Sequence, residues 1–552
     1  MPEQTTPSRS IVNKLDLFAI TFAFLFLLSG LLTLSNYGMS WDEGLGNFFF
    51  GNRYAQYITT FDATYLDFAK VLPEEQPGML QLEQYAPFRD RAHEFPAVVD
   101  MLSASFMRVF AYELNMADPV DAFHSFTILL AAMYLLTQYY YVTVMFDRLT
   151  ALVSILLLGT FPRFWGDMHF NPKDVPETIF FGLTILSFAN WVKKPSWGRA
   201  LVPGFFFGLA IGVKANALFI PVVLAAWLLL WLVSPRQGLP DLVALAKKFK
   251  HILGLGVAAV LTYWASWPLL YNSPGMAKLY FLYIFSQGGR QGKGEWSLQP
   301  LRMLVSSSPE IFLAALVLGL LVAVGLILFR KKEQRLAILL LLWLAIPIAR
   351  ISMPMSVNFD GIRHFLEFLP AATILGGLGV SQVLLWLRHK NDLLYSGFVS
   401  LLVTAFVVNT AVINLLYHPY QYIYFNSLVG GSRGAEKVFK QGEVTDYWAV
   451  SYRDGIRWLN RVAPQDAMLD VPIGDYLVTI PAANWLRKDI TLISDAQVDE
   501  FRGSGRTIYV MHITRPAFYK AVAESCLGAK PVYQKKVDGV SVMQIHLLSD
   551  CK

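Results

Sequence analysis

The chain has 552 residues, of which 55% are hydrophobic and 16% are charged, and its mean hydropathy is +0.43. Soluble proteins carry about 25% charged residues, so this composition excludes a set of ordinary soluble domains as well as a disordered chain. Aromatic residues make up 14% of the chain, and Trp and Tyr favour membrane–water interfaces. The formal net charge of +6 is modest, and the sequence shows no basic stripe of the kind that binds nucleic acid.

Apolar runs that are long enough to cross a membrane recur along residues 1–416. A spanning helix needs about 20 mostly apolar residues, and fewer where neighbouring helices shield its ends. We count about eleven such runs, and the third and fifth are the least certain of them because they are short. They are residues 15–34, 123–145, 151–161, 175–191, 201–213, 217–233, 252–270, 311–329, 336–351, 365–386 and 394–416. The sequence therefore predicts a polytopic α-helical membrane module over residues 1–416.

The last part of the chain, residues 417–552, has ordinary polarity and predicts a separate α/β domain. Strands are expected at 467–473, 507–513, 532–537 and 540–547, and helices at 452–462 and 517–526. An Asp538-Gly539 turn between the last two strands favours a hairpin. Both cysteines, Cys526 and Cys551, fall in this domain, where a disulfide and two free thiols are open alternatives.

The short loops that carry Lys and Arg decide the predicted orientation. They include Lys193-Lys194, Lys247-Lys248 and Arg330-Lys331-Lys332, and all of them share one side in an eleven-span count. The positive-inside rule makes that side cytoplasmic, together with the N-terminus. We therefore expect a multi-pass protein of the plasma (inner) membrane. The C-terminal domain and the connections at 36–122, 161–174, 271–309 and 352–363 would be extracytoplasmic.

Polar residues gather on this predicted outer side, and charges at membrane depth are usually functional. Asp42-Glu43 follows the first span, and His93 lies later in the same large outer loop. As an alternative, Asp42 would be the N-cap of an interfacial helix that the aromatic spacing predicts at 48–57.

The connection at 161–174 is a second polar cluster. It brings His169, Asn171, Lys173 and Asp174 into one short segment. The alternative is a hydrogen-bonded turn in which Asp174 caps the next span.

A third cluster is cationic and contains Arg350 and Arg363-His364. Guanidinium groups bind phosphate bidentately, which points to an anionic substrate, whereas the alternative is snorkelling to lipid headgroups. Residues 287–296 are rich in glycine and do not match a P-loop, because no Gly-Lys-Ser/Thr ends the segment. We expect this segment to be a mobile lid over a site.

In its layout and in several short segments, the sequence resembles the GT-C superfamily of membrane glycosyltransferases. The resemblance is to the family 39-like branch of protein O-mannosyltransferases and aminoarabinose transferases. Asp42-Glu43 resembles the Asp-Glu pair of the family's first outer loop, and His93-Glu94-Phe95-Pro96 is a degenerate form of its His-Pro-Pro element. Asp174 fits the acidic position of the second loop. Further similar segments are Arg363-His364 with Leu369-Pro370, His418-Pro419-Tyr420, Tyr424-Phe425-Asn426, Gly430-Gly431 and Asp446-Tyr447-Trp448.

The resemblance implies an inverting transfer of a sugar from a polyprenyl-phosphate donor to a hydroxyl acceptor on the extracytoplasmic side. It implies Asp42 as the base, with Glu43 and Asp174 as further catalytic candidates. We assign Arg363, Arg350 and Lys173 to the donor phosphate. We assign His169, Asn171, His364 and His93 to the acceptor or to orientation. Glu43 would alternatively pair with an arginine.

Several points stay open at the level of sequence. The acceptor would be a protein, a lipid or a polysaccharide, and the sugar is not specified. Asp42, Asp174 and His169 offer the oxygen and nitrogen ligands of a divalent metal, but no stretch has ligand spacing that identifies one. The alternative function is a secondary transporter or a flippase for a lipid-linked substrate. Transporters tend to have inverted repeats and charges at the midplane, whereas here the charges cluster at one surface.

Overall fold

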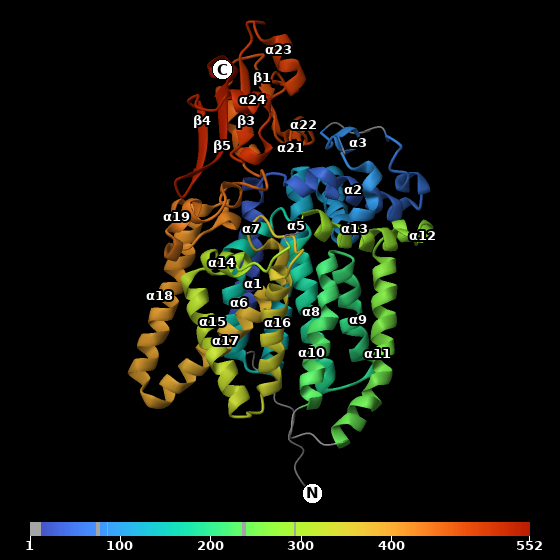
Figure 1. Cartoon of the computed structure of the whole chain (residues 1–552), viewed down its shortest axis with the longest axis vertical. Coiled ribbons are helices and arrows are strands. Elements are labelled where there is room, and N and C mark those ends of the chain that lie inside the picture. Colours follow the sequence, from blue (N-terminus) through green and yellow to red (C-terminus); the bar gives the residue numbers. More distant parts are fainter. Residues whose placement is uncertain (1–12, 73–77, 86, 234–238, 292–293) are drawn as a thin grey trace.

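The computed structural model describes residues 13–72, 78–85, 87–233, 239–291 and 294–552. A bundle of long helices forms one end of the molecule, and the C-terminal part, coloured orange to red, sits on the other end (Figure 1). The loop between α15 and α16, which carries Arg330–Arg335, lies at the end of the bundle away from the C-terminal sheet. The basic loop and the tail therefore lie on opposite sides of the bundle, as the sequence predicts.

Each of the eleven predicted apolar runs coincides with a long or medium-length helix over most of its length, and the run 252–270 extends past the end of α11 into α12 (Leu269–Asn272). The helices are α1 (Lys14–Thr33), α5 (Pro119–Met145), α6 (Arg148–Gly159), α8 (Asp174–Lys193), α9 (Trp197–Ile211), α10 (Ile220–Val233), α11 (Leu239–Ala265), α15 (Glu310–Leu328), α16 (Gln334–Ser352), α17 (Leu369–Lys390) and α18 (Asp392–Tyr417). Among the described residues, seven helices are long and apolar enough to cross a membrane. A polytopic helical membrane protein is thus confirmed, while eleven spans stay a prediction.

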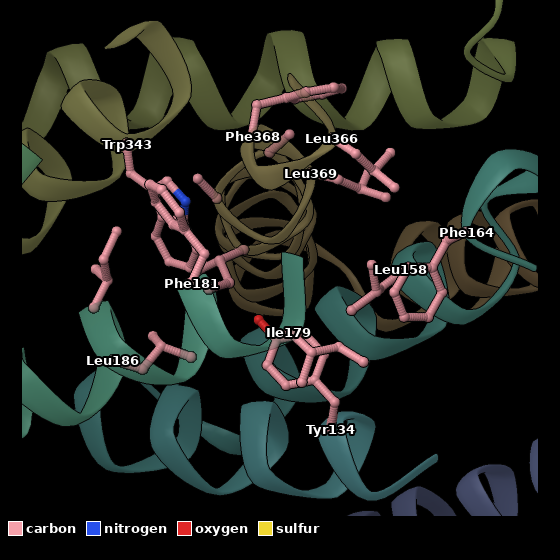
Figure 2. Packing of buried hydrophobic residues seen from close by; sticks show 14 of the residues in the cluster. Tyr134, Leu158, Phe164, Ile179, Phe181, Leu186, Trp343, Leu366, Phe368 and Leu369 are labelled. Atoms are coloured by element: carbon pink, nitrogen blue, oxygen red, sulfur yellow. The ribbon is translucent and has the colours of Figure 1, made fainter. Parts of the chain in front are cut away.

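The bundle core forms where helices come close enough for their side chains to interlock (Figure 2). Trp343 of α16 is fully buried against Phe181 of α8, and its indole N–H donates to the carbonyl of Glu367 at 2.7 Å. α15 and α17 approach still closer, because a Cβ at Gly319 would lie 2.0 Å from the carbonyl oxygen of Leu375. Glycine at such a crossing lets two backbones pack directly, as is common between helices in membranes.

Shorter helices cover the outer end of the bundle. They are α2 (Phe48–Thr60), α3 (Leu82–Tyr85), α4 (Val98–Met107), α7 (Pro162–Asp167), α12 (Leu269–Asn272), α13 (Met276–Gln291) and α14 (Gln299–Ser306). The predicted helix at 48–57 is therefore present as α2. Its Phe48, Phe49 and Phe50 do not lie open at a membrane surface, as an interfacial helix would require, because they are buried in a core that α2 shares with the tail.

The tail carries a five-stranded mixed sheet in the order β2-β1-β3-β5-β4. β1 (Met468–Asp470) pairs in parallel with β2 (Thr491–Ile493) and with β3 (Ile508–Ile513). β5 (Val540–Leu547) is antiparallel to β3 and to β4 (Tyr533–Val537), so the predicted hairpin is present. β2 was not predicted, because a three-residue strand has too little pattern to identify it.

Helices α19 (Gly431–Val438), α20 (Tyr452–Val462), α21 (Tyr476–Thr479), α22 (Ala482–Trp485), α23 (Val498–Phe501) and α24 (Ala521–Ser525) complete the tail. α20 has the predicted bounds, whereas α24 is shorter than predicted because residues 516–518 form a 3-10 turn. Cys526 and Cys551 form a disulfide, which decides between the two alternatives that the sequence left open.

Candidate functional site

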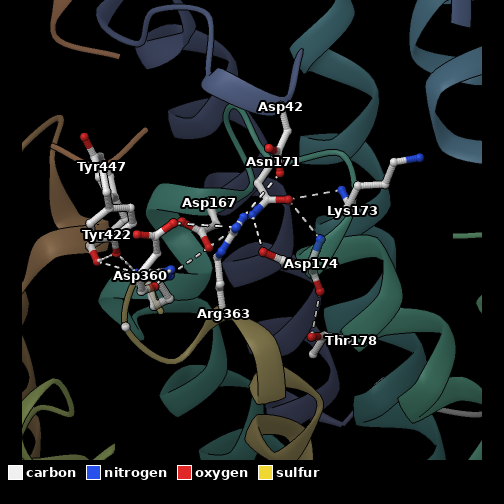
Figure 3. A network of polar contacts seen from close by, with 12 residues as sticks. Asp42, Asp167, Asn171, Lys173, Asp174, Thr178, Asp360, Arg363, Tyr422 and Tyr447 are labelled. Atoms are coloured by element: carbon white, nitrogen blue, oxygen red, sulfur yellow. Dashed lines mark hydrogen bonds and ion pairs between the residues drawn. The ribbon is translucent and has the colours of Figure 1, made fainter. Parts of the chain in front are cut away.

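The candidate site lies where the outer ends of α1 and α8 meet the segment before α17 and the tail (Figure 3). Asp42 follows α1, and its Oδ2 accepts a hydrogen bond from Nη1 of Arg363 at 3.2 Å. The Asp42 side chain is 40% exposed, although it sits beside a buried guanidinium. It makes no side-chain capping bond to the helical turn that follows, so the N-cap alternative does not describe Asp42.

Arg363 is the cation at the centre of the cluster. Its Nη2 lies 3.5 Å from Oδ2 of Asp360, and its guanidinium carbon lies 4.5 Å from the ring centroid of Trp448. Two carboxylates and an aromatic face therefore hold the group in place. Its Nε is buried and has no hydrogen-bond partner, so the guanidinium still has a donor to offer.

Asn171 organises the second polar segment. Its side-chain oxygen accepts from the backbone N–H groups of Lys173 at 3.1 Å and Asp174 at 2.9 Å. Its Nδ2 donates to Oδ2 of Asp174 at 2.8 Å. Asn171 thus satisfies the first turn of α8, and the alternative in which Asp174 does so is wrong.

Asp174 is fully engaged. Besides Asn171, it binds Nζ of Lys214, which lies 2.6 Å from Oδ1. The Asp174 side chain is buried, whereas that of Lys214 reaches the surface in part. Lys214 was missed by sequence reasoning, although a lysine between two apolar runs, at 201–213 and 217–233, was the signal that could have found it.

A second buried arginine links the cluster to the tail. Arg163 donates to Oδ2 of Asp167 and to the carbonyl of Asp360, both at 2.8 Å, and it also contacts the hydroxyl of Tyr447. Burial raises the pKa of Asp167 to about 6, against the opposing charge of Arg163. Arg515 of the tail binds Oδ1 of Asp360 at 2.9 Å, so tail and bundle meet through ion pairs.

Two of the other predicted residues have partners that differ from those expected. Glu43 accepts from the backbone N–H of Ser40 at 2.7 Å and lies 2.9 Å from Nε2 of His124, not beside an arginine. Lys173 donates to Asp100 at 2.7 Å and to the carbonyl of Pro96, so a carboxylate already neutralises its charge.

The two predicted histidines of the outer loops lie apart from Arg363. His169 is buried, stacks on Tyr37 at 3.9 Å between ring centroids, and contacts Thr33 and the carbonyl of Trp165. Burial lowers the pKa of His169 to about 3, so this ring is neutral at physiological pH. His93 lies 3.8 Å from Glu94, at the edge of the Tyr283 ring.

Arg350 and His364 form a buried group with Glu367. Arg350 donates to Oε1 of Glu367 at 3.0 Å and also contacts the carbonyl of His364. The Nε of Arg350 and the Nε2 of His364 are both buried without a hydrogen-bond partner. The Nε of Arg350 can donate a hydrogen bond, whereas the Nε2 of His364 donates or accepts one according to the tautomer of the ring.

The segment 287–296, which the sequence predicts to be a mobile lid, is helical in its first half. α13 runs through Gln291, and residues 292–293 lie outside the described part. Among the described residues, no group of three or more His, Cys, Asp or Glu side chains is arranged to hold a metal ion.

Residues 96–267 match the family model described as dolichyl-phosphate-mannose-protein mannosyltransferase. This match confirms the resemblance to the GT-C superfamily of membrane glycosyltransferases. The matched segment contains Asn171, Asp174 and Lys214, and it contains neither Asp42 nor Arg363. No curated protein matches the chain.

Solved structures with a similar arrangement include three glycosyltransferases. ArnT from Cupriavidus metallidurans bound to undecaprenyl phosphate is 13% identical, with 97% of this chain and 98% of that chain covered and a TM-score of 0.46. The oligosaccharyltransferase AglB from Archaeoglobus fulgidus, with an inhibitory peptide and a dolichol-phosphate, is 13% identical, with coverages of 90% and 69% and a TM-score of 0.47. The arabinofuranosyltransferase AftD from Mycobacteria is 11% identical, with coverages of 96% and 40% and a TM-score of 0.39.

Proposed function

We propose that this protein transfers a sugar from a polyprenyl-phosphate donor to a hydroxyl acceptor on the outer side of the membrane, with inversion at the anomeric carbon. The family match supports glycosyl transfer in a membrane, and the family's dolichyl-phosphate-mannose substrate supports a lipid-phosphate donor. The observation that carries the proposal is the Asp42–Arg363 pair at the outer mouth of the bundle.

Among the carboxylates that surround Arg363, Asp42 is the one able to reach a substrate. Asp174 is held by Lys214 and Asn171, and Asp360 is held by Arg515 and Arg363. Both are nearly inaccessible, with side chains 3% and 6% exposed, whereas Asp42 is 40% exposed. Asp42 is therefore the base in this proposal, and Asp174 is a positioning residue.

The chemistry follows from the properties of a carboxylate. A group with an ordinary pKa near 4 cannot deprotonate an alcohol beforehand, so the proton moves to Asp42 while the acceptor oxygen attacks. The new bond joins that oxygen to C1 of the sugar. The bond between C1 and the phosphate oxygen breaks, and its electron pair leaves with the lipid phosphate.

Arg363 is the proposed partner of the leaving phosphate. Its guanidinium is next to Asp42 and still has an unpartnered Nε, so it can stabilise the negative charge that develops on the phosphate. Arg350, His364 and Lys214 are candidates for further contacts with the donor substrate, because the first two have a buried side-chain nitrogen without a hydrogen-bond partner and Lys214 is partly exposed. Lys173 is the weakest of the predicted cations, because Asp100 neutralises it.

The experiment that tests this function uses the purified protein in lipid nanodiscs with a panel of labelled polyprenyl-phosphate sugars. One donor should be consumed, with label moving to a product and free lipid phosphate appearing in equal amount. The Asp42→Asn variant should lose this reaction. Failure of every lipid-phosphate sugar, or turnover that does not depend on Asp42, would contradict the proposal.

A further inference from the structure

The tail lies directly on the segment that carries Asp42. The loop after β1 reaches Trp41, and Gly474 there has φ +67°, with so little room that a Cβ would lie 3.0 Å from the Trp41 ring. Tyr476, which follows in α21, packs on the backbone of Gly44, where a Cβ would lie 2.6 Å from the tyrosine ring. The tail therefore touches the chain on both sides of Asp42.

Two aromatic side chains from different parts of the chain meet next to Asp42 in the sequence, at Trp41. Trp41 precedes Asp42, and Phe518 of the tail lies 5.6 Å from Trp41 between ring centroids. Phe518 is 43% exposed, so part of its ring is open to a ligand. It is held there by Arg515, whose guanidinium covers the Phe518 ring at 4.6 Å while it binds Asp360.

Tyr476 adds a polar group that the proposed reaction leaves unused. Its ring meets Trp41 edge to face at 5.9 Å, and its hydroxyl is buried without a hydrogen-bond partner. Burial, and after it the charge of Asp42, raises the pKa of Tyr476 well above its usual value, so the hydroxyl stays protonated. An orphaned hydroxyl at this position is able to bind a substrate.

We propose that Trp41, Phe518 and Tyr476 form the acceptor subsite and that the acceptor is a carbohydrate hydroxyl. This inference rests on the proposed function and names its acceptor. A sugar ring has a face of C–H groups that packs on aromatic rings and a rim of hydroxyls that hydrogen-bond. Because the Trp41 and Phe518 rings contact each other, the sugar ring would pack on the accessible faces of this pair, with one hydroxyl bound by Tyr476 and the attacking hydroxyl at Asp42.

A peptide hydroxyl is the competing acceptor. An extended peptide is recognised largely through its backbone hydrogen bonds, commonly at the edge of a sheet. The tail side chains that contact Trp41, the neighbour of Asp42, are instead aromatic rings, which suit a ring-shaped ligand. Tyr476 and Phe518 are positioning residues in this account, and the proton still passes from the acceptor hydroxyl to Asp42.

The test compares transfer with donor hydrolysis, in which water takes the place of the acceptor. The full-length protein receives labelled donor with either an oligosaccharide fraction or a peptide fraction from the envelope of the cells that carry it. We expect label in the oligosaccharide product. Phe518→Ala should raise the KM for this fraction about tenfold, which corresponds to about 1.4 kcal/mol. Tyr476→Phe should lower kcat for transfer about tenfold, and donor hydrolysis should be unchanged in both variants.

Tyr533→Phe is the matched control, because Tyr533 lies in the same domain and stacks on Trp458, away from Trp41. It should leave both KM and kcat unaltered. Label in the peptide fraction, or an unchanged KM and kcat in both subsite variants, would overturn the acceptor subsite while leaving the glycosyl transfer intact. Loss of donor hydrolysis together with transfer in Phe518→Ala would show a structural effect and also contradict the inference. If no Asp42-dependent reaction occurs with any donor, the proposed function itself fails.

Discussion

Asp42 and Arg363 are 321 positions apart in the sequence and form a hydrogen bond at 3.2 Å. Asp42 comes from the loop after the first long helix, and Arg363 comes from the turn that leads into α17. The helices between them only have to end on the same side of the bundle for the two side chains to meet. A carboxylate that is partly open to solvent is thereby held next to a largely buried cation, and the proposed transfer uses this arrangement.

Asp42→Asn tests the role of the carboxylate with a nearly isosteric change. The amide removes the proton acceptor and the charge but preserves size, and Asp42 makes no capping bond that the change would break. We expect turnover to fall by about 10²-fold or more, since positioned base catalysis typically supplies 10²–10⁴-fold. The measurement is the initial rate of label transfer in nanodiscs.

Folding of the Asp42→Asn variant is checked by its thermal unfolding midpoint and by its elution as a single peak in size-exclusion chromatography, both compared with the wild type. Glu43→Gln provides a neighbouring comparison, because Glu43 is buried against His124 and Ser40 and should affect stability more than chemistry. Normal turnover by well-folded Asp42→Asn would remove Asp42 from the mechanism. The next candidate would then be Asp174.

Arg363→Lys keeps the positive charge and removes the planar fork. Arg363 contacts Asp42 and Asp360 through different nitrogens and keeps Nε for a phosphate, whereas a lysine has all three of its donors on one nitrogen and cannot reproduce this spacing. We expect the KM for the lipid-phosphate donor to rise about tenfold, because a hydrogen bond to a charged group contributes about 1.5–3 kcal/mol. Donor titration at saturating acceptor measures this, and Arg388→Lys at the opposite end of α17 is the matched control. An unchanged donor KM would assign phosphate binding to Arg350 or Lys214 instead.

The sequence predicted the architecture well because hydropathy is a strong signal in a membrane protein. Lipid offers no hydrogen-bond partners, so the backbone N–H and C=O groups of a spanning segment must bond to one another. A long apolar run therefore forms a helix wherever it lies in the chain. In the tail, α20 and the hairpin of β4 and β5 were also predicted. The helix has a clear hydrophobic period, and the hairpin has a recognisable turn sequence between its strands. The sequence also marked Asp42, Arg363, Asn171 and Asp174 as site candidates, because polar groups stand out at the ends of apolar runs, and the structure brings these four into one polar cluster (Figure 3).

Partnerships were harder to predict than positions. Nothing near Lys173 in the sequence indicates that its charge is neutralised by Asp100, which lies 73 positions earlier. Likewise, the side chain of Glu43 lies beside His124 and not beside an arginine. Which partner Glu43 has depends on how α5 packs beside the loop after α1. The contribution of Tyr476 and Phe518 depends on docking of the tail onto the bundle, and a composition-based analysis of the tail contains no sign of it.

The orientation in the membrane is open to a direct labelling test. Both native cysteines are in a disulfide, and the described residues contain no free thiol, so introduced cysteines would report alone. We predict that Ser504→Cys, exposed in the tail, reacts with an impermeant maleimide on intact cells and that Lys332→Cys does not. Lys332→Cys should react after permeabilisation. The reverse pattern would place the candidate site in the cytoplasm and contradict an extracytoplasmic acceptor.

The tail should also become less stable as the pH rises, because of two neighbouring carboxyl groups. Asp470 ends β1, and Asp495 follows β2, so the parallel pairing of the two strands brings both side chains to one edge of the sheet. Burial, and then the charge of Asp495, raises the pKa of Asp470 to about 8. Between its ordinary pKa near 4 and this value, the folded tail holds a proton that the unfolded chain has released.

Folding stability must therefore fall as the pH rises through that range and level off above about pH 8, with a slope of at most about 1.4 kcal/mol per pH unit. Calorimetric melting of the full-length protein in nanodiscs between pH 6 and 9 measures the effect. Asp470→Asn has no proton to lose, so the part of the decline that comes from this group should disappear in the variant. Asp499→Asn, an exposed change in the same domain, should keep the wild-type profile. A wild-type midpoint that rises between pH 6 and 8, or an Asp470→Asn profile that matches the wild type, would show that the pair does not share a proton in the folded tail.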